Sequence, residues 1–368
     1  MEKQEIKNEY PNLNSMLNEY CLWMENTSFL NNSLYFYNLT AMLKKYLQNN
    51  FTFQQLKELE KKSQEDVRKL SLTEILDFSI EYIEERMPEY KNDFLRDLAD
   101  GTINIVVDPS TENADNLENE SGKDQNKHNY INTVLRHNTE DPATLIHEFV
   151  HSLNNEEENR ISRDYITEAI SIYFEIDMCN FLKKKGFSSS EIMAHTIFRF
   201  KDLYYCVCNL IPKFSVLTCF CTTGPISNTS YQDMRDLNIF PRPKTKEEFY
   251  HIVERYEKEL AEEKKQAEAL KTKIDQPAQF DPLIPFGYII GTLSAYYAIE
   301  NNNEDMHQAM INLNTLANKK DFDELMSTIG IDVGTAGKLK RTLLPALEKK
   351  VQEIKDYGIT RDEKGKEK

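Results

Sequence analysis

The chain has 368 residues, of which 40% are hydrophobic, so it is long enough to bury a large core and to form more than one lobe. Its 61 acidic and 45 basic side chains give a formal net charge of −16, which argues against a nucleic-acid partner and against binding to an anionic membrane surface. Only 11 glycines and 12 prolines interrupt the sequence, which favours a mainly helical protein.

Residues 1–100 predict an N-terminal helical lobe. The opening residues lack the apolar segment of a secretory signal, so we expect a cytoplasmic protein or one exported by a route independent of a signal peptide. Ser71 and Glu74 form a capping box before an apolar pattern that starts at Ile75, which predicts a helix from this point.

The period of the apolar residues changes after residue 101. Ile103, Ile105 and Val107 alternate with polar residues and predict a strand, and Tyr130–Arg136 predicts a second strand. The segment between them, 108–129, is almost wholly polar, and we expect it to be a mobile loop.

The next segment, ATLIHEFVHSLN, contains His147, Glu148 and His151 in the order HExxH. Asp141 suits a helix N-cap and Pro142 suits the first helical position, so we expect a helix here. Positions four apart share one face of a helix, and the two imidazoles can therefore bind one zinc ion. Glu148 then stands where it can act as the general base toward a metal-bound water.

A second helical pattern, ITEAISIYFE, carries Glu168, with sixteen residues between it and His151. If the second helix runs back over the first in a helix-turn-helix, the Glu168 carboxylate can be a third zinc ligand. The fourth coordination position is then left for water, as in catalytic zinc sites. Glu175 is the alternative third ligand. Neither the glycine nor the third histidine of the metzincin pattern follows His151, so that pattern is excluded.

At these residues the chain resembles the gluzincin clan of zinc metallopeptidases, the group of thermolysin-like and aminopeptidase N-like enzymes. The resemblance implies one Zn²⁺ per chain held by His147, His151 and Glu168, with Glu148 as the base. It implies a predominantly helical α+β fold, in which a gluzincin-like catalytic domain with a small edge sheet is flanked by helical lobes. In gluzincins the strand before the active-site helix forms the sheet edge that binds the substrate main chain, a position that Ile131–Arg136 would take here.

We place the catalytic core at 101–205, a C-terminal helical lobe at 206–358 and a disordered, charged tail at 359–368. The C-terminal lobe begins with CVC and CFC, at Cys206, Cys208, Cys219 and Cys221. Their apolar neighbours favour buried thiols, with a redox or second-metal role as the alternative.

A long helix is predicted over 246–274, where apolar residues near heptad spacing favour an arm packed on its own lobe and leave a partner helix as the alternative. The apolar run FGYIIGTLSAYYA at 286–298 is too short to cross a membrane. Gluzincin-like proteins often carry a similar helix beside the active-site cleft, which implies that Tyr288 donates a hydrogen bond to the oxyanion. The rival donors are Tyr296, His195, His251 and Arg163.

The sequence therefore predicts a zinc-dependent peptidase that acts on peptides or proteins. An endopeptidase is preferred because no amine-anchoring motif lies at a usable distance before the HExxH helix. Two other hypotheses stay open, a catalytically silent binding protein with this fold and a helical interaction protein in which HExxH arose by chance.

Overall fold

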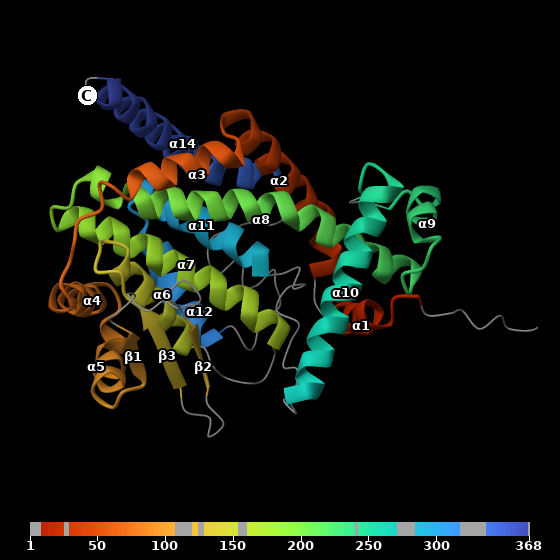
Figure 1. Ribbon diagram of the computed structural model, residues 1–368, viewed down its shortest axis with the longest axis horizontal. Coiled ribbons are helices and arrows are strands. Elements are labelled where there is room, and N and C mark those ends of the chain that lie inside the picture. Colours follow the sequence, from red (N-terminus) through yellow and green to blue (C-terminus); the bar gives the residue numbers. More distant parts are fainter. Residues whose placement is uncertain are drawn as a thin grey trace, which may run out of the picture.

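A computed structural model describes residues 9–25, 29–106, 120–123, 129–153, 160–239, 242–270, 284–316 and 336–366 of the chain. Over these ranges the protein is predominantly helical and has a small three-stranded sheet, which confirms the predicted α+β class. In Figure 1 the sheet lies below α6 (Asp141–Leu153). Stacked above this helix are α7 (Arg160–Lys184), α11 (Ile284–Asn301) and α8 (Ser189–Thr223).

The N-terminal helices pack at several places around this stack. They are α1 (Pro11–Glu25), α2 (Phe29–Asn50), α3 (Phe53–Ser63), α4 (Leu72–Arg86), the 3₁₀ turn η1 (Pro88–Tyr90) and α5 (Lys91–Ala99). The predicted capping box at the start of α4 is confirmed, because the backbone N–H of Glu74 donates to Ser71 Oγ at 3.2 Å and that of Ser71 donates to Glu74 Oε2 at 2.8 Å. These hydrogen bonds lower the pKa of Glu74.

The sheet contains β1 (Ile103–Val106), β2 (Glu120–Lys123) and β3 (Asn129–Val134) in the order β1-β3-β2. β1 is parallel to β3 with Ile103 opposite Ile131, and β2 is antiparallel to β3 with Ser121 opposite the same residue. The prediction that the strand before the HExxH helix forms a sheet edge is therefore wrong. The prediction failed because β2 lies in a polar segment without the alternation of apolar and polar residues that predicts a strand. The sequence therefore did not reveal that β3 has a neighbour on this side.

The helix that carries the HExxH motif is α6 (Asp141–Leu153), and it packs on the sheet, α4 and α7. Asp141 begins this helix, but its carboxylate accepts from the backbone N–H groups of Arg136 at 3.0 Å and Asn138 at 2.9 Å instead of capping the first turn. Asp141 thus ties the end of β3 to the start of α6, and burial raises its pKa.

Three long helices form the core above α6. They are α7 (Arg160–Lys184), α8 (Ser189–Thr223) and α11 (Ile284–Asn301), and α7 contacts both of the others. Gly291 of α11 allows a close approach to α7, since a Cβ at this position would lie 2.9 Å from Ala169 Cα and closer still to Ala169 O. This contact fixes α11 directly beside the turn of α7 that carries Glu168.

Helix α8 continues through the predicted boundary at 205–206. Cys206 and Cys219 lie 13 residues apart on it, which corresponds to about 20 Å at about 1.5 Å per residue, so the two CxC pairs do not form one four-thiolate site. No disulfide joins any of the six cysteines, all of which lie in described ranges. By length and composition α8 could cross a membrane, but 67% of its most apolar window is buried inside the protein, as in the core helix of a soluble protein.

The remaining helices are α9 (Ser230–Asp236), α10 (Lys246–Leu270), α12 (Glu304–Leu316) and α14 (Ala336–Lys366). On α10 the predicted apolar positions Phe249, Val253 and Leu260 are buried, and the helix packs on α1 and α8 (Figure 1). The predicted extension of α10 over 271–274 lies outside the described residues, and a partner helix at 246–274 stays a prediction.

Helix α14 runs to Lys366, whereas the sequence predicts a disordered tail from 359. Arg361 explains the difference, since its guanidinium contacts Asp66 at 3.0 Å and donates to the backbone O of Lys62 at 2.8 Å. The tail is therefore held by residues about 300 positions earlier in the chain, which local composition does not reveal.

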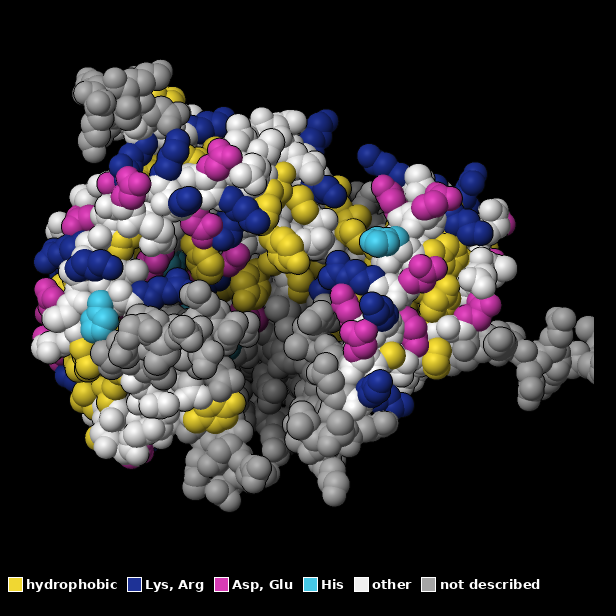
Figure 2. Space-filling view, viewed as in Figure 1, with side chains coloured by type: hydrophobic (Ala, Val, Ile, Leu, Met, Phe, Trp, Pro, Cys, Tyr) yellow, Lys and Arg dark blue, Asp and Glu magenta, His cyan; other side chains and the backbone are white. Residues whose placement is uncertain are grey.

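Charged side chains of both signs are interspersed over the face of the molecule shown in Figure 2, and hydrophobic side chains gather over α8 near its middle. On this face the acidic side chains do not form a separate patch but lie among basic ones, as expected for a solvated surface.

Candidate metal centre

His147 and His151 lie one turn apart on α6, and their Nε2 atoms are 3.0 Å from each other. The apolar residues between and before them, Ile146, Phe149 and Val150, are fully buried and fix the rotation of the helix. The two imidazoles therefore converge on one point, as the i, i+4 spacing predicts.

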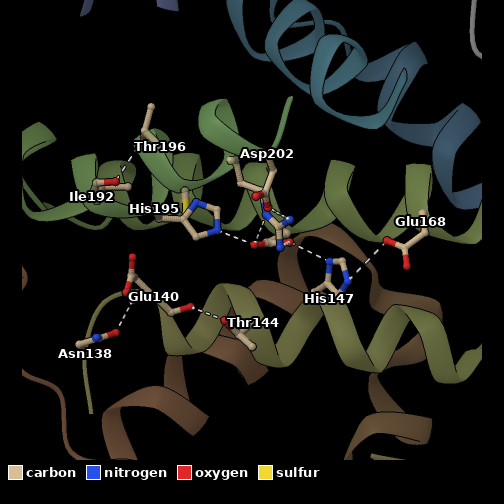
Figure 3. A network of polar contacts seen from close by, with 12 residues as sticks. Asn138, Glu140, Thr144, His147, Glu168, Ile192, His195, Thr196 and Asp202 are labelled. Atoms are coloured by element: carbon tan, nitrogen blue, oxygen red, sulfur yellow. Dashed lines mark hydrogen bonds and ion pairs between the residues drawn. The ribbon is translucent and has the colours of Figure 1, made fainter. Parts of the chain in front are cut away.

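Glu168 reaches the same point from α7. Its Oε1 lies 3.5 Å from His151 Nε2, and its Oε2 lies 4.0 Å from His147 Nε2. One ligand atom from each of the three side chains lies within 4.8 Å of the others, and no second such group occurs within the described ranges. Figure 3 shows Glu168 directed at His147 from the neighbouring helix. The structure thus brings the three predicted ligands together.

These three side chains fit a divalent metal ion. Ligand atoms about 2.1 Å from a tetrahedral ion lie about 3.4 Å from one another, which is close to the observed separations. Glu168 Oε2 is buried and has no hydrogen-bond partner among the described residues, which is unfavourable unless a cation neutralises it. Two nitrogens and one carboxylate oxygen are a donor set that Zn²⁺ accepts.

The pKa of each candidate ligand is shifted. Burial would lower the pKa of His147, but Glu175 outweighs it and raises this pKa. Burial, followed by the neighbouring His147, lowers the pKa of His151 to about 3, so its ring stays neutral and keeps a lone pair for an ion. Burial is also the largest influence on Glu168, and it raises the pKa of this carboxyl above its ordinary value. A cation at the site would reverse that effect.

Glu175, the alternative third ligand, lies on the opposite side of His147. Its Oε2 is 2.7 Å from His147 Nδ1, whereas Nε2 faces the other two ligands. A carboxylate in this position favours the proton on Nδ1 and leaves Nε2 as the metal-binding atom. The geometry therefore favours Glu168 over Glu175 as the ligand and gives Glu175 an orienting position.

Glu175 is only 1% exposed and is stabilised by two residues of α8. Arg199 Nε donates to its Oε1 at 2.6 Å and Arg199 Nη2 lies 2.6 Å from its Oε2, while His195 Nε2 lies 2.6 Å from Oε1. Burial alone would raise the pKa of Glu175, but Arg199 and His147 outweigh it and hold this pKa well below the ordinary value. Glu175 is therefore a carboxylate.

Sequence reasoning missed Arg199, and it considered His195 only as an oxyanion donor. The available signal was their i, i+4 spacing among apolar residues in the first half of α8, since a buried arginine needs an acidic partner. The partner itself, on another helix, was not predictable from this spacing. Asp202, one turn further on, accepts from Arg199 Nη1 at 3.2 Å and completes the network shown in Figure 3.

A cavity of about 320 Å³ opens beside His147, whereas His151 and Glu168 are not among the residues that line it. Its walls include His147, Glu148, Arg199, Asp202 and Tyr288. Glu148 is buried next to His147 and lines this space, which is where a base for a bound water must lie.

Tyr288, on α11, lies close enough to Glu168 for the charge of Glu168 to influence its pKa, and it faces the same cavity. Its ring centre lies 5.9 Å from the guanidinium carbon of Arg199. The charge of Glu168 and then burial raise the pKa of Tyr288 well above its ordinary value, so its hydroxyl keeps its proton and can donate it to a hydrogen bond.

The rival oxyanion donors are placed differently. His195 is engaged with Glu175, Tyr296 lines a separate small cavity, and His251 is exposed on α10. The side chain of Arg163 lies outside the described part of the chain.

No family model and no curated protein sequence matches this chain. Solved structures do match. A candidate peptidase from Chlamydophila abortus aligns with a TM-score of 0.54 at 15% identity, over 95% of this chain and 62% of that protein. PZ peptidase A, solved with an inhibitor, aligns with a TM-score of 0.52 at 12% identity, over 87% of this chain and 58% of that protein. The chain spans about three fifths of the length of these proteins, and it shares their fold.

Proposed function

We propose that this protein is a zinc-dependent peptide-bond hydrolase, and specifically an endopeptidase. The observation that carries the proposal is the convergence of His147 Nε2, His151 Nε2 and the Glu168 carboxylate on one point beside a cavity lined by Glu148. The fold shared with peptidases supports it. The preference for internal bonds rests on the lack of an amine-anchoring motif before α6 in the sequence.

His147, His151 and Glu168 would hold the zinc ion, which supplies a Lewis acid and brings the pKa of a bound water to about 7. Glu148 would take up a proton from the water that attacks the peptide carbonyl carbon and would deliver it to the leaving amine when the C–N bond breaks. Tyr288 donates its hydroxyl hydrogen to the carbonyl oxygen as negative charge develops there. Glu175 keeps the His147 proton on Nδ1 throughout.

The test has two parts. Zinc uptake by the metal-free full chain is measured first, and about one equivalent is expected for wild type. Less than half an equivalent after reconstitution would mean that HExxH is accidental. A defined mixture of peptides is then incubated with wild-type protein and with Glu148→Gln, and the products are mapped by mass spectrometry.

Cleavage within peptides by wild type, lost in Glu148→Gln with zinc retained, is the expected result. Zinc uptake without cleavage by wild type would leave the silent binding protein as the correct reading. If Glu148→Gln keeps both its zinc and full activity, Glu148 is not the base.

A further inference from the structure

We propose that Cys179 is an oxidation site, at which His195 and Glu175 prepare the thiol for reaction with hydrogen peroxide to give a sulfenic acid. The proposal stands on a contact between Cys179 Sγ and His195 Nδ1 at 3.2 Å, in a small cavity on the far side of Glu175 from the candidate metal ligands. It does not depend on the proposed peptidase activity.

The three side chains have the arrangement of a nucleophile, a base and a group that orients the base. His195 Nε2 lies 2.6 Å from Glu175 Oε1, and a carboxylate can only accept a hydrogen bond, so the proton of the ring lies on Nε2. Nδ1 is then directed at the thiol and can take up its proton. Burial would lower the pKa of His195, but Cys179 and Glu175 outweigh it and raise this pKa to about 10, so a proton taken from the thiol stays on the ring and leaves an imidazolium beside a thiolate.

The cavity beside this pair has a volume of about 40 Å³. A water needs about 10–15 Å³ measured in this way, so a molecule with two oxygen atoms has room. The walls include Lys183, Lys350 and Tyr296 as well as Cys179 and His195. Arg199 and the acidic Glu300 line the cavity too, and Lys350 is paired with Glu353 at 2.6 Å, so the wall carries charges of both signs.

Tyr296 independently indicates that this cavity binds a polar molecule. The residue is 3% exposed, and its hydroxyl has no hydrogen-bond partner among the described residues. Buried hydroxyls are rarely left without a partner, because an unpaired buried polar group is unfavourable. A peroxide oxygen, or the oxygen of a sulfenic acid at Cys179, would supply the missing acceptor.

Two other buried cysteines, Cys206 and Cys219, have different surroundings. Cys219 is fully buried, and its Sγ lies 3.5 Å from Thr223 Oγ1 and 3.7 Å from the backbone O of Ser230. Burial raises its pKa to about 11, and burial also raises the pKa of Cys206. Among the cysteines with described contacts, Cys179 has the imidazole neighbour, and Cys219 serves as an internal control.

The reaction balances with peroxide as the only oxidant. The sulfur of Cys179 attacks one peroxide oxygen, so that the S–O bond forms while the O–O bond breaks. Sulfur loses two electrons and the peroxide gains them. The thiol proton passes to His195 and then to the departing hydroxide, which leaves as water.

The test uses the full-length chain treated with hydrogen peroxide, followed by a 1,3-dione reagent that traps sulfenic acids and by peptide mapping. We expect Cys179 to be labelled at least tenfold faster than Cys219 in the folded protein, and at a similar rate in urea, where the chain is unfolded. Equal rates for the two cysteines in the folded protein would overturn the proposal.

His195→Gln should slow labelling of Cys179 at least tenfold and leave Cys219 unchanged, provided that circular dichroism shows a folded protein. Tyr296→Phe removes one hydroxyl from the cavity wall and covers the case in which His195→Gln does not fold. It should slow Cys179 severalfold, whereas the matched change Thr196→Val on the same wall should not. An unchanged Cys179 rate in the folded His195→Gln protein or in Tyr296→Phe would contradict the assigned environment.

Discussion

Glu175→Gln is the substitution that tests most directly whether α8 supports the candidate metal centre. It keeps the size of the side chain but removes its charge. The carboxylate now accepts from or contacts His147, His195 and Arg199, all of which present donors. A glutamine has one acceptor oxygen, and its amide nitrogen would face a donor, so one of these contacts must break.

The expected loss of zinc affinity follows from the contact with His147. Removing an outer partner of a metal-binding histidine lowers affinity by about 10–100-fold, which is about 1.4–2.7 kcal/mol. The metal-free protein should also lose stability, because breaking a buried ion pair costs about 3–5 kcal/mol. We expect the lower end of that range, since Asp202 still accepts from Arg199 at 3.2 Å.

Zinc affinity is measured by competition with a chelator, and stability by urea unfolding of the metal-free chain. Asp202→Asn is the matched control, because Asp202 contacts Arg199 but is no partner of His147. It should leave zinc affinity within about threefold of wild type. If folded Glu175→Gln binds zinc as tightly as wild type, Glu175 does not orient His147 and the account of the network is wrong.

Three other changes test the ligand set, the packing and the pH response. Glu168→Ala removes the third ligand and should lower zinc affinity more than Glu175→Gln does in the same chelator competition; equal binding by wild type and Glu168→Ala would exclude it as a ligand. Gly291→Ala should lower the free energy of unfolding, measured in urea, by about 1–3 kcal/mol, because the new Cβ meets the backbone of Ala169. The control is Gly358→Ala, whose Cβ meets the flexible end of the Leu59 side chain at 3.1 Å. This control should leave the free energy of unfolding unchanged or raise it. Burial lowers the pKa of His307 in the folded protein. In the unfolded chain this histidine takes up a proton near pH 6.5, whereas in the folded chain it is protonated only at a lower pH. Stability should therefore fall as the pH falls below about 6.5, and His307→Gln should fall less steeply; parallel profiles would contradict this assignment.

Local signals allowed much of the site to be predicted. The spacing of His147 and His151 sets both imidazoles on one helical face, and the apolar residues around them turn that face toward α7. The capping box at Ser71 fixed the start of α4 for a similar reason, because both of its hydrogen bonds lie within one turn. Such features depend on neighbours in sequence, so sequence is sufficient to find them.

The features that sequence missed depend on pairings between distant segments. Strand β2 reaches β3 from a polar stretch, and Arg361 reaches Asp66 across most of the chain. The pairing of Arg199 with Glu175 needs the register between α7 and α8, which is set by side-chain packing along both helices. Periodicity gives the face of each helix, but it does not give this register.

Helix α7 explains why the ligand and the network must be considered together. Glu168, Glu175 and Cys179 follow one another at intervals of seven and four residues, so at 3.6 residues per turn all three lie on one face of the helix. That face meets α6 at the histidines and α8 at His195. A rotation of α7 that withdrew Glu168 from His151 would also withdraw Glu175 from His147, because both are rigidly carried by the same helix. The position of Glu168, the proposed third ligand, is therefore stabilised by the buried charges of Glu175 and Arg199, about two turns away.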